Sequence, residues 1–241
     1  MRPRALVTGG GIRVGRAIAL ELAGAGHDVA IHYRHNDKAA RAVAEEAAAL
    51  GVDSFVVGAD LQEVAGCTAV VDRIKERWDT LSVLVNNASI FAPAPFAELA
   101  LADWERMQAI NLRAPFLLSQ GLLPLLQAAR GTVVHMCDIG ADRPVSGYTH
   151  YSVSKAGLVM LVKAMAVELA PAVRTVGISP GQVAWPDDYD EDKRRRLSQR
   201  IPMGAAGAPR DVATLIRFLV TEATYLNGVV VPVDGGLSVR Y

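Results

Sequence analysis

The segment Ala5-Leu-Val-Thr-Gly-Gly-Gly-Ile-Arg-Val-Gly15 decides the fold class of this chain. Its apolar start, residues 5–7, is typical of a buried strand, and the periodic apolar residues that follow predict a helix over 12–25. Glycines between a strand and a helix let the backbone approach a pyrophosphate, which the amide groups at the helix N-terminus then bind. A tight turn without a ligand would use the same residues. Because a strand, turn and helix follow in this order, the segment favours a nucleotide-binding α/β domain.

Strand-like and helix-like segments alternate from this turn onward. Strands separated by helices of ten or more residues predict parallel βαβ units in a doubly wound sheet, with helices on both faces. The 241 residues therefore predict one Rossmann-type α/β domain over 1–241, with a sheet of about seven strands. We expect strands at 5–7, 28–32, 53–57, 81–85, 132–136, 174–179 and 228–233, and helices at 12–25, 38–50, up to 78, 102–129, from 151 and 209–220.

Composition excludes several classes of function. A formal net charge of zero, with 21% charged residues, argues against broad electrostatic binding to nucleic acid or to an anionic membrane. Cys67 and Cys137 lack metal-ligand spacing, so we expect no metal site, and Cys137 is expected in the core. The chain runs from Met1 straight into a strand, and no apolar run is long enough to span a bilayer. We therefore expect a cytoplasmic protein.

The most charged segment is 187–200, in which acidic residues precede basic ones. That order complements the dipole of a helix, so a solvated surface helix is one interpretation. Its position after the sixth predicted strand also fits a mobile flap over the ligand crevice. We accordingly mark 182–207 as a substrate loop or flap within the single domain.

The end of the second predicted strand discriminates between nicotinamide cofactors. NAD sites place an acid there for the ribose 2′-hydroxyl, whereas NADP sites need room and positive charge for the 2′-phosphate. This chain reads His32-Tyr-Arg34-His35-Asn36, with no carboxylate before Asp37. The pattern favours NADPH/NADP. Any of His32, Arg34, His35 and Asn36 could make the contact, and Arg34 is our first choice.

Three side chains suited to proton transfer converge after the fifth predicted strand. Tyr151 and Lys155 are four residues apart, so they share one face of a helix. Asp138 follows a buried-looking strand, at the edge where open parallel sheets place their ligand crevice. An exposed helix start is the alternative for the tyrosine and the lysine. Arg13, in the glycine turn, could set a guanidinium beside phosphates or an anionic ligand, or could lie on the surface.

Taken together, these motifs resemble the short-chain dehydrogenase/reductase family over essentially the whole chain. The resemblance implies a single-domain Rossmann-type fold, a nicotinamide cofactor and a homotetramer. Each motif is weak alone, and their shared order makes the resemblance specific. The matching motifs are the 8–15 turn, Asp60, Asn86-Asn-Ala-Ser89, Asn111, Tyr151-x-x-x-Lys155, Pro180-Gly181 and Val233-Asp-Gly-Gly236.

The resemblance also implies roles for individual residues. Tyr151 would be the catalytic acid, and Lys155 would lower the pKa of Tyr151 and bind the nicotinamide ribose. Asn111 would hold a water in the proton relay, Asp60 would meet the adenine, and Asn87 would shape the cofactor cleft. Asp60 and Asn87 could equally cap helices or turns. The catalytic set is therefore Asp138, Tyr151, Lys155 and Asn111, and the cofactor-binding set is Gly9, Ile12, Arg13, Gly15, His32, Arg34, Asn36, Asp60, Leu61, Asn87, Ala88, Ser89, Tyr151, Lys155, Pro180, Gly181 and Val183.

Two positions depart from the common family pattern. Asp138 stands thirteen residues before the tyrosine, where a serine is usual, and Arg13 replaces the middle glycine of the turn. Both departures are similar to those of pteridine reductases and dihydromonapterin reductases, as are Asn87-Ala-Ser-Ile-Phe91-Ala-Pro-Ala-Pro95 and Gly147-Tyr148. In that subgroup Phe91 would stack on the pterin, although it could instead plug the core, and Tyr148 could be a surface residue. The implied substrate-binding set is Arg13, Ser89, Phe91, Asp138, Tyr148 and Tyr151.

The sequence thus predicts an NADPH-dependent reductase of a small pterin-like substrate, a dihydropterin or dihydrofolate. A carboxylate at 138 is a better partner for amino-pyrimidinone N–H donors than a hydroxyl, and a flat ring stacks well on an aromatic face. An ionised Asp138 would repel the oxyanion that develops when a simple ketone is reduced. The alternatives are a short-chain carbonyl reductase acting on a 3-oxoacyl or sugar substrate, and a non-catalytic NADP-binding sensor.

Overall fold

The computed structural model describes residues 2–185 and 189–240 of the chain. At its centre lies a seven-stranded sheet with the strand order β3-β2-β1-β4-β5-β6-β7, and every neighbouring pair of strands is parallel. The predicted doubly wound sheet is therefore confirmed. The strands are β1 (Arg4–Val7), β2 (Asp28–Tyr33), β3 (Ser54–Gly58), β4 (Val83–Asn86), β5 (Thr132–Met136), β6 (Arg174–Pro180) and β7 (Val230–Val233).

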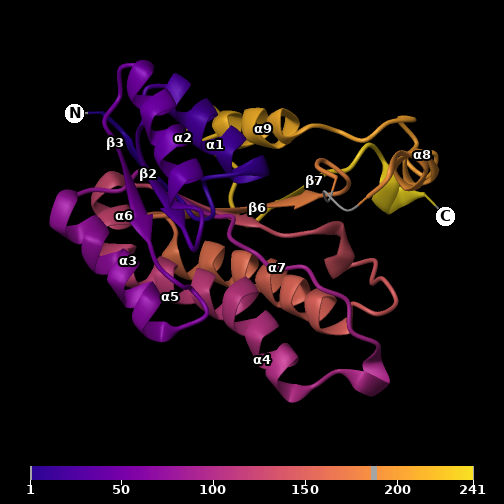
Figure 1. Cartoon of the computed structure of the whole chain (residues 1–241). Coiled ribbons are helices and arrows are strands. Elements are labelled where there is room, and N and C mark those ends of the chain that lie inside the picture. The colour runs from indigo at the N-terminus through magenta and orange to yellow at the C-terminus, as the bar shows by residue number, and fades with distance from the viewer. Residues whose placement is uncertain (1, 186–188, 241) are drawn as a thin grey trace.

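Helices cover both faces of the sheet (Figure 1). One face carries α1 (Arg13–Gly24), α2 (Asp37–Ala49) and α9 (Pro209–Thr221). The opposite face carries α3 (Val64–Arg77), α4 (Leu101–Gln108), α5 (Ala114–Gly121), α6 (Leu123–Ala129) and α7 (Thr149–Leu169). The short helix α8 (Glu191–Ser198) lies beyond the end of the sheet, near the C-terminus.

The core consists of two main layers of apolar side chains, one on each face of the sheet. Ile18 of α1 and Ile216 of α9 pack in the first layer, and Ile74 of α3 and Leu118 of α5 pack in the second. Because helices cover both faces, the five inner strands are buried on both sides and read as nearly continuous apolar runs, whereas the edge strands β3 and β7 are partly exposed. Cys137, expected in the core, is buried.

The predicted helix over 102–129 is wrong as a single element. The chain forms α4, then a wide π turn at Ala109–Arg113, then α5, and bends by 60° at Leu122 before α6. Pro124 explains the bend, because it has no N–H to donate and its ring clashes with the preceding turn of a continuous helix. Among the described residues no single helix is long and apolar enough to cross a membrane, although α4–α5 and α6 together pass that test as a bent pair.

Other boundaries shift by one or two residues. β4 begins at Val83 because the N–H of Leu81 bonds instead to the carbonyl of Leu125 in α6. The helix that carries the tyrosine begins at Thr149, two residues earlier than predicted. The charged segment forms α8, in which Asp190 caps the N-terminus. Residues 187 and 188 of that segment lie outside the described part of the chain, and the flap over 182–207 stays a prediction.

The strand order determines where a ligand can bind. β1 lies between β2 and β4, so the chain winds outward in opposite directions from the β1–β4 pair. Loops that follow β1 and β4 therefore leave on opposite faces and open a crevice at the carboxyl ends of the strands. The glycine turn follows β1, and Asn87 follows β4, so both border this crevice.

Candidate active site

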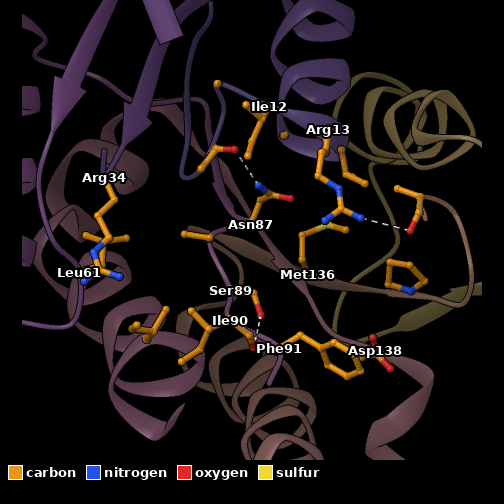
Figure 2. Close-up of a pocket in the computed structure, with 18 of the residues that line it drawn as sticks. Ile12, Arg13, Arg34, Leu61, Asn87, Ser89, Ile90, Phe91, Met136 and Asp138 are labelled. Atoms are coloured by element: carbon orange, nitrogen blue, oxygen red, sulfur yellow. Dashed lines mark hydrogen bonds between the residues drawn. The ribbon is translucent and has the colours of Figure 1, made fainter. Parts of the chain in front are cut away.

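A cavity of about 650 Å³ occupies this crevice. Figure 2 shows Arg34 and Leu61 at one end, Phe91 and Asp138 at the other, and Asn87 between them. The cavity is therefore elongated along the carboxyl edge of the sheet, as a dinucleotide site requires. All the residues that we assigned to the cofactor line it, namely Gly9, Ile12, Arg13, Gly15, His32, Arg34, Asn36, Asp60, Leu61, Asn87, Ala88, Ser89, Tyr151, Lys155, Pro180, Gly181 and Val183.

The glycine turn has the close packing that a pyrophosphate cradle needs. Gly9 has a φ of +62°, and a Cβ on Gly15 would lie 2.1 Å from the carbonyl oxygen of Gly9. Asn87 Nδ2 donates to the carbonyls of Thr8 and Gly9, at 2.8 and 3.2 Å. At the start of α1, the N-cap residue Ile12 makes no side-chain cap hydrogen bond. The amides of the first turn can therefore bind a phosphate, and the turn fits a dinucleotide.

Arg34 and Asp60 form the far end of the cavity. Arg34 Nε donates to Asp60 Oδ2 at 2.9 Å, and Asp60 Oδ1 accepts from the N–H of Gln62 at 2.9 Å. Asp60 therefore acts both as a turn cap and as the partner of a partly exposed guanidinium. A guanidinium carries five donors, and the ion pair holds this one in place with donors to spare. Arg34, our first choice among the four candidates at the end of β2, therefore lines the cavity with an oriented guanidinium.

His32 lines the cavity but cannot serve as a phosphate donor. Its Nδ1 accepts from the N–H of Gly9 at 3.2 Å, and its Nε2 bonds to the carbonyl of Ala59 at 3.1 Å. Burial lowers the pKa of His32 to about 4, so the ring is neutral at pH 7. A neutral ring with both nitrogens engaged has no donor left for a phosphate. The expectation that His32 contacts the 2′-phosphate directly is therefore wrong, and His32 instead holds the glycine turn in place. Asn36, another of the four candidates, caps α2 by accepting from the N–H of Ala39.

Arg13 adopts a backbone conformation that is unusual for a residue with a side chain. Its φ is +51°, in the left-handed region, which costs roughly 1–3 kcal/mol for a residue other than glycine. Its guanidinium donates to the carbonyls of Ala184 and Trp185, both at 3.2 Å, as Figure 2 shows for one of these bonds. Arg13 therefore joins the glycine turn to the segment after β6, at the edge of the cavity.

The acid, the phenol and the ammonium do converge. The Tyr151 hydroxyl donates to Asp138 Oδ2 at 2.8 Å, and Asp138 Oδ1 accepts from the N–H of Gly140 at 2.6 Å. Lys155 Nζ donates to the carbonyl of Met136 at 2.8 Å and lies 5.6 Å from the centre of the Tyr151 ring. The tyrosine and the lysine are buried, whereas the aspartate is half-buried. The predicted acid, phenol and ammonium are thus brought together by the segment after β5 and by α7.

The electrostatics of this group differ from what the resemblance implies. Burial, and then the neighbouring charge of Asp138, raise the pKa of Tyr151 well above its usual value. Burial lowers the pKa of Lys155, although Asp138 acts in the opposite direction. The net pKa of Tyr151 is therefore raised, opposite to the lowered pKa that the resemblance implies, because burial and the carboxylate 2.8 Å away both disfavour tyrosinate. Tyr151 keeps its proton at neutral pH.

Aromatic rings form a wall beside Asp138. Phe91 stacks on Tyr148, with ring centres 4.3 Å apart and planes 10° from parallel, and meets Tyr151 edge-on at 4.8 Å. The Phe91 side chain is 52% exposed. Phe91 is therefore not a core plug, and Tyr148 is not an isolated surface residue. Phe91 thus remains about half exposed beside Asp138, and a planar ligand could stack on its open part.

Asn111 lies in the π turn, buried below the cavity. Its Oδ1 accepts from the N–H of Ile90 at 2.9 Å and from Ser89 Oγ at 3.1 Å. Its Nδ2 donates to the carbonyl of Ile90 and to Ser154 Oγ, both at 3.1 Å. Both ends of the amide are thus engaged by the protein, and the expected role of Asn111 in holding a relay water stays a prediction. Asn111 instead ties the loop after β4 to α7, and Ser89 lines the cavity from that loop.

Comparisons with known proteins agree with this arrangement. The family model described as enoyl-(acyl carrier protein) reductase matches residues 11–238. The 3-oxoacyl-[acyl-carrier-protein] reductase FabG of Staphylococcus aureus is 31% identical over 98% of both chains, and that of Aquifex aeolicus is 34% identical over 96% of both. A solved short-chain dehydrogenase/reductase of Serratia marcescens, a double mutant, superposes with a TM-score of 0.92 at 32% identity, over 98% of both chains. This chain belongs to the short-chain dehydrogenase/reductase family. It is an oxidoreductase, and its family uses NAD(H) or NADP(H).

In this short-chain dehydrogenase/reductase, the motif Val233-Asp-Gly-Gly236 has a structural role. Asp234 Oδ1 accepts from the N–H of Gly236 at 2.9 Å, and Oδ2 accepts from that of Ser238 at 2.7 Å. A Cβ on Gly181 would lie 2.7 Å from the Cβ of Asp234. The motif therefore packs the C-terminal segment directly against the loop after β6, so position 181 has no room for a side chain.

A second cavity, of about 660 Å³, extends the site of this oxidoreductase, and the motifs do not reveal it. Arg143, Arg200 and Arg240 line it, and none of them belongs to a family motif. They lie in three segments far apart in the sequence, so no local pattern could have grouped them. The two cavities meet at Phe91, Asp138, Tyr151, Pro180, Gly181 and Gln182.

Proposed function

We propose that this protein is an NADPH-dependent reductase of a pterin-like substrate, such as a dihydropterin or dihydrofolate. The observation that carries the proposal is the 2.8 Å hydrogen bond from the Tyr151 hydroxyl to Asp138 Oδ2, at the junction of the two cavities. Arg34, with no carboxylate before Asp37 at the end of β2, supports NADPH as the cofactor.

A carboxylate beside the catalytic phenol suits a nitrogen heterocycle better than a ketone. Reduction of a ketone develops negative charge on the oxygen, and an ionised Asp138 would oppose that charge. The amino-pyrimidinone edge of a pterin instead offers N–H donors, which a carboxylate accepts in strong charge-assisted bonds. Phe91 presents its partly exposed ring beside Asp138, so a flat heterocycle could stack there while its edge meets the carboxylate.

In the proposed reaction, separate side chains bind the cofactor and transfer the proton. NADPH, when bound, supplies a hydride, which reduces the carbon of a ring C=N bond. The glycine turn and Arg34 bind the phosphates, and Lys155 lies where it can bind the nicotinamide ribose. Tyr151, whose pKa is raised by burial and by Asp138, is protonated at neutral pH and delivers that proton to the ring nitrogen. The Tyr151 oxygen then takes up a proton from solvent, and Asp138, which accepts the hydrogen bond of the restored hydroxyl, orients it at the border of the two cavities.

A second candidate function is reduction of a 3-oxoacyl thioester. The named curated relatives are 3-oxoacyl-[acyl-carrier-protein] reductases, so the comparisons support this candidate more than they support pterin reduction. Tyr151 and Lys155 serve either reaction. The side chains at 138 and 91 favour the pterin, because an ionised carboxylate neither donates to a carbonyl oxygen nor stabilises its charge.

The decisive assay follows NADPH oxidation with 7,8-dihydromonapterin, dihydrobiopterin, dihydrofolate and acetoacetyl-CoA side by side. The same set is repeated with Asp138→Ser and with the control Asp142→Ser, which makes the same change four residues away in an exposed loop. We expect turnover of a pterin, and a fall of about 100-fold or more in Asp138→Ser if the carboxylate acts in proton transfer.

Turnover of acetoacetyl-CoA alone, or its improvement in Asp138→Ser, would replace the proposal with the second candidate. Asp138→Ser should also lower the pKa of Tyr151, because the variant removes a negative charge that raises it. The alkaline limb of the pH–rate profile, where Tyr151 loses its proton, should then move to lower pH.

A further inference from the structure

Three arginines gather at the outer part of the second cavity. Arg143 follows the short 3-10 turn Ile139–Ala141, Arg200 follows α8, and Arg240 lies in the C-terminal segment. Arg143 Nη1 donates to the carbonyl of Arg240 at 2.6 Å, and Arg240 Nη1 donates to the carbonyl of Gln199 at 2.9 Å. Since Gln199 precedes Arg200, these bonds bring all three segments together. Figure 1 shows α8 beside the C-terminal end of the chain.

The charges along this cavity are separated. Asp138, half-buried against Tyr151, is the one acidic residue in its described lining, and the three arginines are exposed. No ion pair within residues 2–185 and 189–240 includes any of the three guanidinium groups. Each guanidinium has five donors, and the two carbonyl bonds occupy only one donor each of Arg143 and Arg240. The cavity therefore has an acceptor at its inner end and excess positive charge at its outer end.

We propose that the outer end of this cavity binds an anionic group, a carboxylate or a phosphate ester, at the end of the substrate opposite the reacting group. Arginine suits this task because its planar donors match both oxyanions, often in pairs. A substrate that spans the cavity would then place N–H donors at Asp138 and oxyanions at the arginines. The inference rests on the proposed function in one respect: it takes the second cavity as the place where the reductase holds its substrate.

The test measures binding by titration calorimetry, with the whole protein loaded with NADP⁺. Three ligands share the pterin head group and differ in the tail. Folic acid carries carboxylates, neopterin monophosphate carries a phosphate ester, and biopterin carries neither. A thioester pair, acetoacetyl-CoA and uncharged acetoacetyl-N-acetylcysteamine, covers the second candidate function. We expect the anionic member of at least one set to bind more tightly, with an advantage that falls as salt is raised.

Variants then assign the effect to the arginines. Arg200→Gln is the first choice, because the Arg200 side chain makes no hydrogen bond within the described chain. We expect it to reduce the preference for the anionic ligand about 2- to 5-fold, the range for an exposed ion pair. Arg200→Gln with Arg240→Gln should reduce the preference further, and Arg200→Lys should restore part of it. The control is Arg195→Gln, which removes the same charge from α8 at a residue paired with Asp192.

Three results would overturn the inference. One is that no anionic ligand binds more tightly than its uncharged counterpart. Another is that Arg195→Gln reduces the preference as much as Arg200→Gln, because an equal effect would indicate only non-specific long-range electrostatic attraction. The third is a preference that the arginine variants leave intact. Failure of the proposed function is a separate result: if the thioester pair binds and the pterins do not, the pterin proposal fails, and the arginines are still tested with the thioesters.

Discussion

The two halves of the site use polar side chains in opposite ways. In the cofactor half, the polar groups of His32 and Asn87 bond to the backbone of the glycine turn, and Arg34 pairs with Asp60. In the substrate half, Phe91 is half-exposed, and Asp138 borders both cavities. One half is tied together before any ligand arrives, and the other presents its functional groups to the cavity.

The contrast has a physical reason. A pyrophosphate is bound by backbone amides, so the task of nearby side chains is to hold that backbone in place. A substrate ring is recognised by side chains themselves, which must reach the cavity with unused hydrogen-bonding capacity and open faces. Changes in the first half should therefore act mainly on stability and cofactor affinity, whereas changes in the second should act mainly on turnover and substrate choice.

The largest effect is expected for Tyr151→Phe in the substrate half. Loss of the phenolic proton should lower kcat by about 100- to 10,000-fold, the usual contribution of a general acid. Steady-state NADPH oxidation measures it, with Tyr225→Phe as the control because Tyr225 is fully exposed. Undiminished function in Tyr151→Phe would identify a non-catalytic NADP-binding protein instead.

The next effect concerns stability against pH in the cofactor half. The pKa of His32 is about 4 in the fold and 6.5 as its ordinary value, so the unfolded chain takes up the proton first. Stability is complete above pH 6.5 and is lost as pH falls toward 4, by up to about 3 kcal/mol from this residue.

His32→Gln should therefore flatten the dependence of the unfolding free energy on pH, by at most about 1.4 kcal/mol per pH unit in that window. Glutamine can still accept from Gly9 and donate to Ala59, so the fold should persist. Urea unfolding between pH 7 and pH 4 measures the slope. The exposed His35→Gln is the control, and an equal flattening in that variant would contradict the burial argument.

Gly15→Ala should destabilise the glycine turn. Its Cβ would lie 2.1 Å from the Gly9 carbonyl oxygen and 2.6 Å from Asn87 Nδ2, so the turn must move. We expect a loss of about 1–3 kcal/mol in stability and weaker NADP⁺ binding. Gly24→Ala, in the last turn of the same helix, meets nothing within 4 Å. Thermal unfolding should show this control to be neutral or stabilised by up to about 1 kcal/mol, and similar losses in both variants would refute the packing argument.

The smallest effect is expected for Phe91→Ala. Loss of one stacking face should weaken binding of a planar ligand by about 2- to 10-fold, from the 0.5–1.5 kcal/mol of an aromatic pair. Calorimetry with biopterin measures it, and Phe96→Ala, at a more exposed phenylalanine in the same loop, is the control. An equal change in the two variants would mean that Phe91 contributes no specific stacking.

Local patterns were enough for most of the fold. Strand and helix periods, and the glycines between them, depend on neighbouring residues, so five of the seven strands were placed to within one residue of their observed bounds. The interruption of the helix over 102–129 is not predicted, because the apolar period continues through Pro124. The start of β4 was misplaced because Leu81 bonds to α6, a contact that no local pattern contains.

The same division holds for the site. The sequence by itself determined the Rossmann-type fold, the glycine turn and the positions of Asp138, Tyr151 and Lys155, because each depends on residue type and short-range spacing. Only the tertiary structure decided that His32 and Asn111 are engaged by the protein, that the pKa of Tyr151 is raised, and that three distant arginines line one cavity. Hydrogen-bond partners, burial and long-range charge exist only once remote segments are packed together, and for that reason spacing along the chain could not reveal them.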